Sequence, residues 1–351
     1  MRNDVGETKL NRWLSDLIPV ARSLLGLVAI VLAAIALSPQ DRDGWPIFLT
    51  LGNWTNIVRQ MSEIGILALG MTLVILSAGI DLSVGSVLAL GATITAKLLM
   101  VWDPGIAVWL HIAVAIAAAL ATCALTGFIN GLIIAQLSIQ PFVVTLAAMI
   151  GFRGLARWIS QNSNIGLSFD ENHISGIFTS VFANPYVVIG IFAASSVVFA
   201  VLLSRTVFGR YVRAMGDNAL AAEYAGLPIR RTQIAVYTIA GLMAGLAGMI
   251  HCAQNSQGNP NDGMAYELDA IAAVVIGGTS LRGGKGTIFG AVVGTLTLGV
   301  ITNILGLKGV DENVKWMAKA VIIVLAVLLQ QPETFHKLLS GVRRLTTSVR
   351  Q

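Results

Sequence analysis

The chain contains repeated apolar stretches, most of them long enough to cross a lipid bilayer as a helix. A hydrocarbon core of about 30 Å needs about 20 apolar residues per helix. Hydrophobic residues make up 55% of the chain and charged residues 12%, whereas about a quarter of an ordinary soluble domain is charged. We therefore expect an all-α, polytopic membrane protein with a single transmembrane domain over residues 1–351. About ten crossings are expected, some of them short or discontinuous, at residues 20–37, 57–77, 84–101, 106–135, 142–159, 185–203, 232–252, 265–280, 287–305 and 315–330.

The distribution of lysine and arginine predicts which ends face the cytoplasm, because basic loops stay on that side of a membrane. The segments on one side carry 15 basic residues and those on the other side carry 8. We therefore expect a cytoplasmic N-terminal segment (1–19), a cytoplasmic insert (204–231) and a cytoplasmic basic tail (331–351). The aromatic residues near the outer helix ends, where headgroups favour such rings, are Trp54, Trp102, Trp109, Trp158, Tyr186 and Trp316.

The first apolar stretch has an alternative interpretation as a secretion signal, because Ala34-Ile35-Ala36 resembles a signal-peptidase site. The stretch is longer than the usual core of about 7–15 residues, and a charged segment of 19 residues precedes it. A retained first helix is therefore the expectation.

A charged residue interrupts the apolar sequence between the second and third crossings. Asp81 lies within Gly79-Ile80-Asp81-Leu82-Ser83-Val84-Gly85-Ser86. A charge at the bilayer centre costs about 2.5–3.5 kcal/mol on insertion scales, so a charged residue in this region is expected to have a structural or functional role. Asp81 could cap a helix that starts near Leu82 by accepting a hydrogen bond from the amide of Ser83 or Val84. It could also contact the substrate, and both interpretations stay open here.

Four further polar residues lie in or beside the apolar stretches. Glu267 and Asp269 open the eighth crossing after a polar loop, where the helix dipole favours acidic side chains. Facing an outer vestibule, the same carboxylates could accept hydrogen bonds from a polyhydroxylated ligand. Asn130 and Asn303 are neutral, and such residues commonly bond across helices.

Residue spacing predicts two kinds of helix contact. Arg59 and Glu63 stand four apart on one helix and are expected to pair with each other. Small residues at intervals of three or four allow two backbones to approach closely in a membrane. Such intervals separate Gly241, Gly245 and Gly248 on one helix, and Gly290 and Gly294 on another.

The sequence offers no motif of an enzyme or of a nucleotide-driven motor. The nearest match to the phosphate-binding pattern Gly-x-x-x-x-Gly-Lys-Ser/Thr is Gly283-Gly284-Lys285-Gly286-Thr287. It has Thr279 in place of the first glycine, and a glycine follows its lysine. We therefore interpret it as a cytoplasmic turn in which glycines adopt φ values that other residues adopt only with strain. The two cysteines and four histidines show no metal-binding spacing. We expect no enzyme, and no cofactor or metal in this chain.

The longest segment between crossings on the basic side is the insert at 204–231. Its part Met215-Gly216-Asp217-Asn218-Ala219-Leu220-Ala221-Ala222-Glu223-Tyr224-Ala225-Gly226-Leu227-Pro228 predicts a short helix, with Asp217 or Asn218 at its start and Gly226 at its end. A membrane chain without a motor of its own would have to receive force from another subunit. We therefore interpret this helix as a docking site for a cytoplasmic partner. The alternative is an ordinary surface helix between two crossings.

Three blocks of sequence carry a resemblance to a known family. They are residues 79–86, residues 209–228, and the run from Glu267-Leu268-Asp269-Ala270 through Gly277-Gly278-Thr279-Ser280-Leu281-Arg282-Gly283-Gly284-Lys285-Gly286-Thr287. In these blocks and their order the chain resembles the permease subunits of bacterial ATP-binding-cassette importers for sugars, the ribose, xylose, arabinose and galactose group. The resemblance covers about residues 53–330. It departs from the family at Thr302-Asn303-Ile304, where Asn-Gly-Leu is expected, and at Asp217, where many relatives have glycine.

The resemblance implies an assembly in the bacterial inner (plasma) membrane. Its core would be two permease subunits, identical or related, surrounded by membrane lipid. A pair of cytoplasmic ATPase subunits would hold ATP and Mg²⁺, and an extracytoplasmic sugar-binding protein would deliver the cargo. The permease would then open alternately to the two sides, and nucleic acid is not expected as a partner. Related permeases also move polyols, inositol and a sugar-like signalling molecule, so the solute itself stays open.

Two sets of residues follow as functional candidates. The residues expected to couple the permease to its ATPase are Gly216, Asp217, Asn218, Ala221, Ala222 and Gly226. The residues expected along the translocation pathway are Asp81, Asn130, Glu267, Asp269 and Asn303.

The main alternative is an ion-coupled secondary transporter, whose discontinuous helices give a similar hydropathy pattern. Such a transporter would need buried titratable residues, and the apolar stretches are nearly free of them. A scaffold or receptor without transport is a further alternative.

Overall fold

The protein is a bundle of helices with one small pair of strands. The computed structural model describes residue 21 and residues 23–101, 107–168 and 173–330. After the first helix, Ser23–Leu37, the elements are η1 (Ile47–Leu49), α2 (Leu51–Leu76), α3 (Val84–Met100), α4 (Val108–Leu137), α5 (Pro141–Ile159), β1 (Ile165–Gly166), α6 (Ile174–Phe182), α7 (Pro185–Arg205), α8 (Val207–Asp217), α9 (Ala219–Tyr224), α10 (Ile229–Asn255), β2 (Gln257–Gly258), α11 (Tyr266–Ile276), α12 (Ile288–Leu307) and α13 (Glu312–Gln330).

A helix occupies each of the ten predicted apolar stretches. Within the described residues, six helices are both long and apolar enough to cross a membrane: α2, α4, α5, α7, α10 and α12. The expectation of a helical, polytopic membrane protein is therefore confirmed, whereas the number of crossings and the cytoplasmic position of the termini stay predictions. The predicted terminal segments 1–19 and 331–351, and Trp102, lie outside the described residues.

Two features of the fold were not predicted. Helix α6 lies between the predicted crossings at 142–159 and 185–203, where no element was predicted. Strands β1 and β2 pair antiparallel, with Ile165 opposite Gly258 and Gly166 opposite Gln257. This pair joins the segment after α5 to the segment after α10, and the other described elements are helices, as expected.

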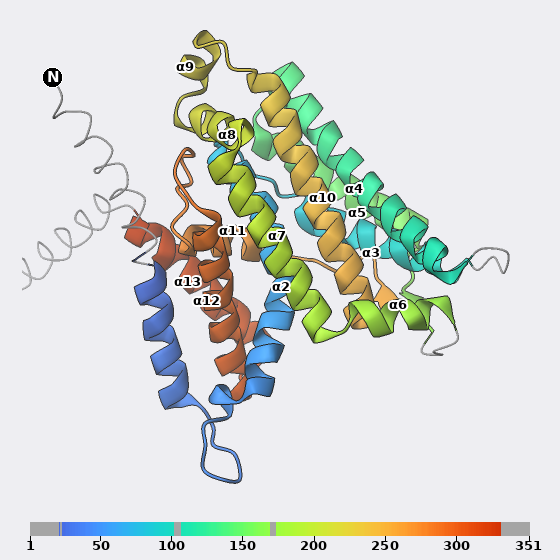
Figure 1. Ribbon diagram of the computed structural model, residues 1–351, viewed down its shortest axis with the longest axis vertical. Coiled ribbons are helices and arrows are strands. Elements are labelled where there is room, and N and C mark those ends of the chain that lie inside the picture. Colours follow the sequence, from blue (N-terminus) through green and yellow to red (C-terminus); the bar gives the residue numbers. More distant parts are fainter. Residues whose placement is uncertain (1–20, 22, 102–106, 169–172, 331–351) are drawn as a thin grey trace, which may run out of the picture.

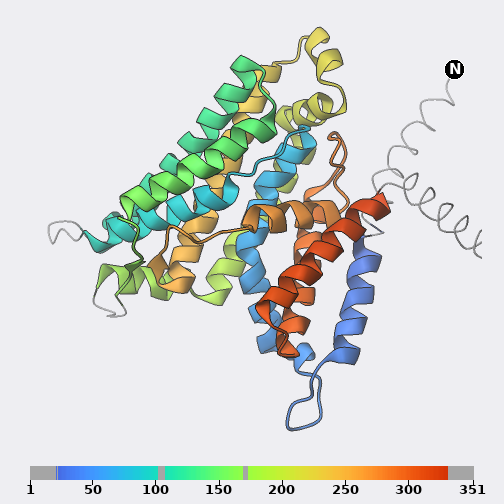
Figure 2. The same cartoon turned by 180° about the vertical axis from the view of Figure 1, so that it is seen from behind.

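Helix α2 lies at the centre of the bundle (Figure 1). Helices α3, α4, α5 and α10 lie on one side of it, and α12, α13 and the helix Ser23–Leu37 lie on the other side, as the reverse view also shows (Figure 2). Burial follows this arrangement, since 83% of the apolar window of α2 and 67% of that of α10 are buried, against 17% for α5 and 22% for α7. The outer helices thus present apolar side chains to lipid, as expected for helices that are apolar all round.

The predicted glycine contacts are confirmed. A Cβ atom at Gly241 would overlap the carbonyl of Cys123 on α4, and one at Gly248 would overlap the carbonyl of Leu88 on α3. On α12, a Cβ at Gly290 would overlap the carbonyl of Gly277. These helices pack backbone against backbone, which is how apolar helices gain contact energy when lipid is as apolar as their side chains.

Candidate coupling surface and translocation pathway

The insert between α7 and α10 folds into two helices at one end of the molecule (Figure 1). Thr206 caps α8 by accepting a hydrogen bond from the Gly209 amide, and Asn218 caps α9 by accepting one from the Ala221 amide at 2.9 Å. The predicted helix with an Asn218 cap is therefore confirmed, whereas Asp217 is the last residue of α8 and does not cap α9. Gly226 ends the segment with φ of +79°, a conformation that glycine adopts without strain.

The residues that were predicted to couple the chain to an ATPase differ in their solvent exposure. Asp217, Asn218, Ala221 and Gly226 are exposed, but Gly216 and Ala222 are buried. Buried residues cannot form an outer contact surface, so the direct docking role predicted for Gly216 and Ala222 does not fit this arrangement.

Two exposed apolar side chains on α9 were missed by the sequence interpretation. Leu220 is 68% exposed and Tyr224 is 91% exposed. They stand four apart, which places them on the same face of the helix. The signal in the sequence was a pair of large apolar residues in a short helix between basic segments.

Gly216 lies where α8 meets the end of α2. A Cβ atom at this position would overlap the carbonyl oxygen of Leu76 and lie within 2.6 Å of the Gly284 amide nitrogen. The same amide donates a hydrogen bond to the Leu76 carbonyl at 3.0 Å. Gly283 and Gly284 have φ of +89° and +72°, which confirms the prediction of a glycine-dependent turn. Helix α8 thus rests on the end of α2 and on the turn before α12.

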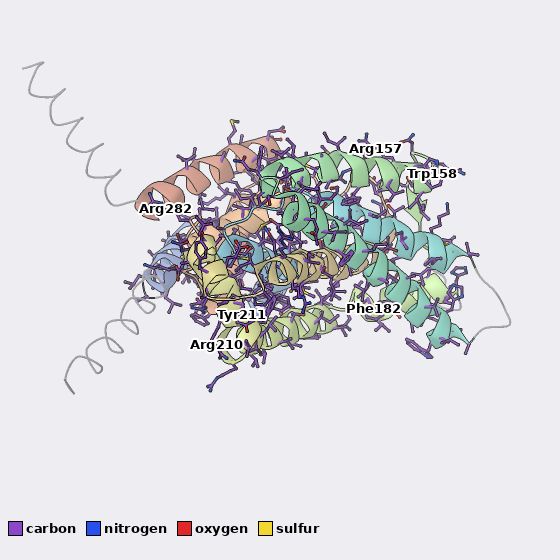
Figure 3. All side chains as sticks on the ribbon, turned by 90° about the horizontal axis from the view of Figure 1, so that it is seen from above. Arg157, Trp158, Phe182, Arg210, Tyr211 and Arg282 are labelled. Atoms are coloured by element: carbon purple, nitrogen blue, oxygen red, sulfur yellow. The ribbon has the colours of Figure 1, made fainter. Side chains whose placement is uncertain are left out.

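Basic side chains belong to the same end of the molecule. Figure 3 looks down on this end and labels Arg210 and Tyr211 of α8 and Arg282 of the turn before α12. Arg210 and Arg282 are exposed. An exposed basic end suits contact with an acidic partner surface or with anionic lipid headgroups.

The break between α2 and α3 is fixed by buried hydrogen bonds. Asp81, only 2% exposed, accepts hydrogen bonds through Oδ1 from the Ser83 amide at 2.8 Å and from the Ser83 hydroxyl at 2.6 Å. The Ser83 hydroxyl in turn accepts a hydrogen bond from Nδ2 of Asn130 on α4 at 3.0 Å. Asp81 therefore has the expected local partner, although α3 begins at Val84 and not at Leu82. Asn130 bonds across helices, as predicted.

We expect Asp81→Ala to lower both the yield of folded protein and the transport rate. The change leaves the Ser83 amide and hydroxyl without their acceptor, and an unpaired buried polar group costs about 1–3 kcal/mol. Asp81→Asn keeps one acceptor oxygen and is expected to lose less. Thermal unfolding of the purified protein and solute uptake would be measured together. Unchanged uptake and stability in Asp81→Ala would contradict this role.

The remaining predicted pathway residues do not form one site. Asp269 pairs with Lys319 of α13, Oδ2 to Nζ at 2.9 Å, and Asn303 exchanges two hydrogen bonds with Asn53 of α2, at 2.8 and 3.2 Å. Glu267 is half-buried, and its Oε2 lies where a Cβ on Gly85 of α3 would be. These acidic residues do stand in the first turn of α11, but Asp269 does more than complement the helix dipole, because it also ties α11 to α13.

The predicted Arg59–Glu63 pair is wrong. Nη1 of Arg59 donates to Oε1 of Gln254 at 2.7 Å. Oε2 of Glu63 instead lies 2.7 Å from Nδ1 of His251, and the other ring nitrogen of His251 lies 3.1 Å from Oδ2 of Asp262. The packing of α10 on α2 brings His251 to Glu63 and Gln254 to Arg59, while Nη2 of Arg59 also donates to Oδ1 of Asn56 on α2 at 3.1 Å. Helices α2 and α10 therefore contain a buried pair of titratable residues, Glu63 and His251, contrary to the expectation from the sequence.

A cavity of about 580 Å³ lies beside this cluster. It is lined by residues of α2, α10, α11, α12 and α13, among them Glu63, His251, Gln254, Tyr266 and Asp269. Of the predicted pathway residues only Asp269 lines it. The structure thus separates a polar cavity at the α13 side from the Asp81–Asn130 cluster at the start of α3.

Comparison with known proteins shows to which family the chain belongs. Residues 53–329 match the family described as branched-chain amino acid transport system / permease component. The chain belongs to this permease family. The match covers α2 to α13, and thus the insert, the break at Asp81 and the cavity.

Curated relatives support the same assignment. The permease is 40% identical to the ribose import permease protein of Escherichia coli K12, over 90% of this chain and 94% of that protein. It is 36% identical to the corresponding protein of Haemophilus influenzae, over 93% and 97%, and 36% identical to the D-allose transport system permease protein of Escherichia coli K12, over 87% and 90%. No solved structure matches the chain significantly.

Family membership confirms several predictions from the sequence. The chain is a permease component of an ATP-binding-cassette import system and not an enzyme, since ATP hydrolysis belongs to a separate subunit of such systems. It is an integral protein of the bacterial inner membrane, which agrees with its membrane-capable helices.

Proposed function

We propose that this permease moves a monosaccharide or a sugar-like solute into the cytoplasm by alternating access. The observation that carries the proposal is the 40% identity to a ribose import permease over 90% of the chain. The family description mentions branched-chain amino acids, but the curated relatives reported above are named for sugars. Because these relatives are named for more than one sugar, the particular sugar stays open.

The partners of the permease follow from the same membership. A cytoplasmic ATPase, with its ATP and Mg²⁺, supplies the force, an extracytoplasmic binding protein delivers the solute, and a second permease subunit, identical or related, completes the pathway. Both termini and the insert face the cytoplasm in this proposal. Helix α9 is the contact for the ATPase, through the exposed face of Leu220 and Tyr224 together with Asp217, Asn218, Ala221 and Gly226.

We expect Tyr224→Ala to lower stimulated ATP hydrolysis by at least about tenfold, because removing an aromatic anchor from an interface costs about 2 kcal/mol or more. Hydrolysis by the reconstituted transporter would be measured with and without loaded binding protein. Tyr186→Ala is the matched control, since Tyr186 is 73% exposed and lies at the end of α7 opposite to the insert. Equal hydrolysis by Tyr224→Ala and the wild type would contradict the assignment of this face.

Transport energetics tests the proposed function against the ion-coupled alternative. Buried Glu63 and His251, with the part-buried Asp262 beside them, give that alternative titratable groups that were not expected from the sequence. We expect uptake into vesicles to require ATP and to survive a protonophore. Uptake by the permease alone, abolished by the protonophore and indifferent to ATP, would support the alternative instead.

A further inference from the structure

The cavity beside His251 lies in the half of the bundle that is remote from the insert. Helix α10 leaves the insert at Ile229 and reaches the cavity near its other end, at His251, Gln254 and Asn255. Its volume of about 580 Å³ falls within the usual range for small-molecule sites, about 300–1,000 Å³. A monosaccharide is small enough to occupy it with room for water.

Two buried polar atoms at the cavity lack a hydrogen-bond partner within the described part of the chain. They are Nε2 of Gln254 and Oγ1 of Thr302. Oε1 of Gln254 is already used by Arg59, so the amide is oriented and its N–H groups remain available. Buried donors and acceptors are nearly always satisfied in proteins, and both side chains belong to the cavity wall, so we expect them to form hydrogen bonds with a bound ligand.

The charged side chains at the cavity already have partners. Asp269 pairs with Lys319, Glu63 with His251, and Arg59 donates to Gln254. A cationic ligand would have to displace Lys319 from Asp269 or His251 from Glu63, or lie beside them without a carboxylate partner of its own, which is unfavourable. A neutral ligand needs no such exchange.

Aromatic rings complete the wall. Tyr266 stands edge-to-face to His251, with ring centroids 5.9 Å apart, and Trp316 of α13 also lines the cavity. Aromatic rings offer flat apolar surface beside polar groups. This combination matches the two kinds of surface on a sugar ring, its C–H face and its rim of hydroxyl groups.

We propose that this cavity is a subsite for a neutral monosaccharide on its way through the permease, with Gln254, Thr302 and Trp316 as contact residues. The proposal rests on the proposed function, since it assigns a place to the same solute.

Thiol protection in the complete transporter tests the subsite. Thr302→Cys introduces a reactive group of similar size, while the native Cys123 and Cys252 are buried. The modification rate by a small hydrophilic maleimide would be measured with and without D-ribose, D-allose, L-arabinose or L-leucine. At a sugar concentration about ten times Kd, a sugar that is transported is expected to slow modification about tenfold, and leucine is expected to have no effect. Ser180→Cys, exposed on α6, is the control that no sugar should protect.

A second variant keeps the proposal testable if Thr302→Cys does not fold. Gln254→Leu removes the amide at nearly constant volume, and we expect it to lower the amount of sugar moved per ATP hydrolysed about tenfold, as for one lost hydrogen bond. Gln257→Leu in β2 lies outside the cavity lining and is expected to behave as the wild type.

The outcomes separate the two proposals. Uptake of a sugar by the wild type, without protection of Thr302→Cys and with an unchanged ratio in Gln254→Leu, would overturn the subsite alone. Protection by leucine, or a Thr302→Cys that is unreactive even without sugar, would also overturn it. Failure of the wild-type transporter to take up any of the three sugars with ATP would overturn the proposed function, and with it the subsite.

Discussion

Gly241→Val is expected to reduce the amount of folded permease in the membrane by at least about tenfold, because a core change of this kind consumes much of a marginal stability. A Cβ at position 241 would overlap the backbone carbonyl oxygen of Cys123. It would also lie only 3.0 Å from the Cα and the amide nitrogen of Gly127. These are backbone atoms of α4, which cannot move away by a change of rotamer as a flexible side chain can. Helices α4 and α10 would have to separate, which would remove the contact between a central helix and its neighbour.

The measurement is the amount of monodisperse protein extracted from membranes. Gly190→Val on α7 is the matched control, because it places the same β-branched residue in a spanning helix where no other atom lies within 4 Å. Overpacking of a core usually costs about 1–3 kcal/mol, and contact with immovable backbone puts Gly241 at or above that range. A normal yield of monodisperse Gly241→Val protein would show that α4 and α10 do not pack as described.

Gly216→Val is expected to lower uptake at least about tenfold while leaving the permease inserted in the membrane. The valine would push α8 away from the Leu76 carbonyl and from the Gly284 amide. Helix α8 lies outside the helices capable of spanning the membrane, so the bundle itself keeps its packing. The contact between the insert and the end of α2 would be lost, and with it the route by which movement of α9 could reach the break at Asp81.

Uptake by the Gly216→Val transporter would be compared with its extracted amount, and a fall of at least about tenfold in uptake per molecule is expected, as for a broken core contact. Gly154→Val on α5, where a Cβ meets no atom within 4 Å, controls for the size of the side chain. Wild-type uptake by Gly216→Val would mean that force from the ATPase enters the permease elsewhere.

Local features of the fold could be predicted from neighbouring residues. Asn218 and Gly226 mark the two ends of a helix because a side-chain oxygen and a positive φ act within a few residues. Gly241 and Gly248 predicted close packing for a similar reason, since they mark one face of one helix. Which helix would fill that face, α4 for one glycine and α3 for the other, was not in the local pattern.

The polar sites could be predicted only as separate residues. Asp81 and Asn130 were both candidates, but the sequence did not indicate that Ser83 joins them. Arg59 and Glu63 had suitable spacing but do not pair with each other. Glu63 pairs with His251 of α10, because burial between two helices strengthens such a hydrogen bond, and Arg59 donates to Gln254 of α10 and to Asn56 of α2. The exposure of Leu220 and Tyr224 depends on how α9 packs on the rest of the chain, so it could be known only from the structure.

The sequence by itself determined that this chain is a membrane permease. Both the length of an apolar stretch and the sequence blocks of the family are properties of consecutive residues, which need no tertiary structure to be recognised. Tertiary structure alone decided where its polar groups meet. Glu63 and His251 are 188 residues apart, and no periodicity relates such positions. Only the packing of α10 on α2 brings them together, because each helix must bury its polar side chains against a neighbour that lipid cannot replace.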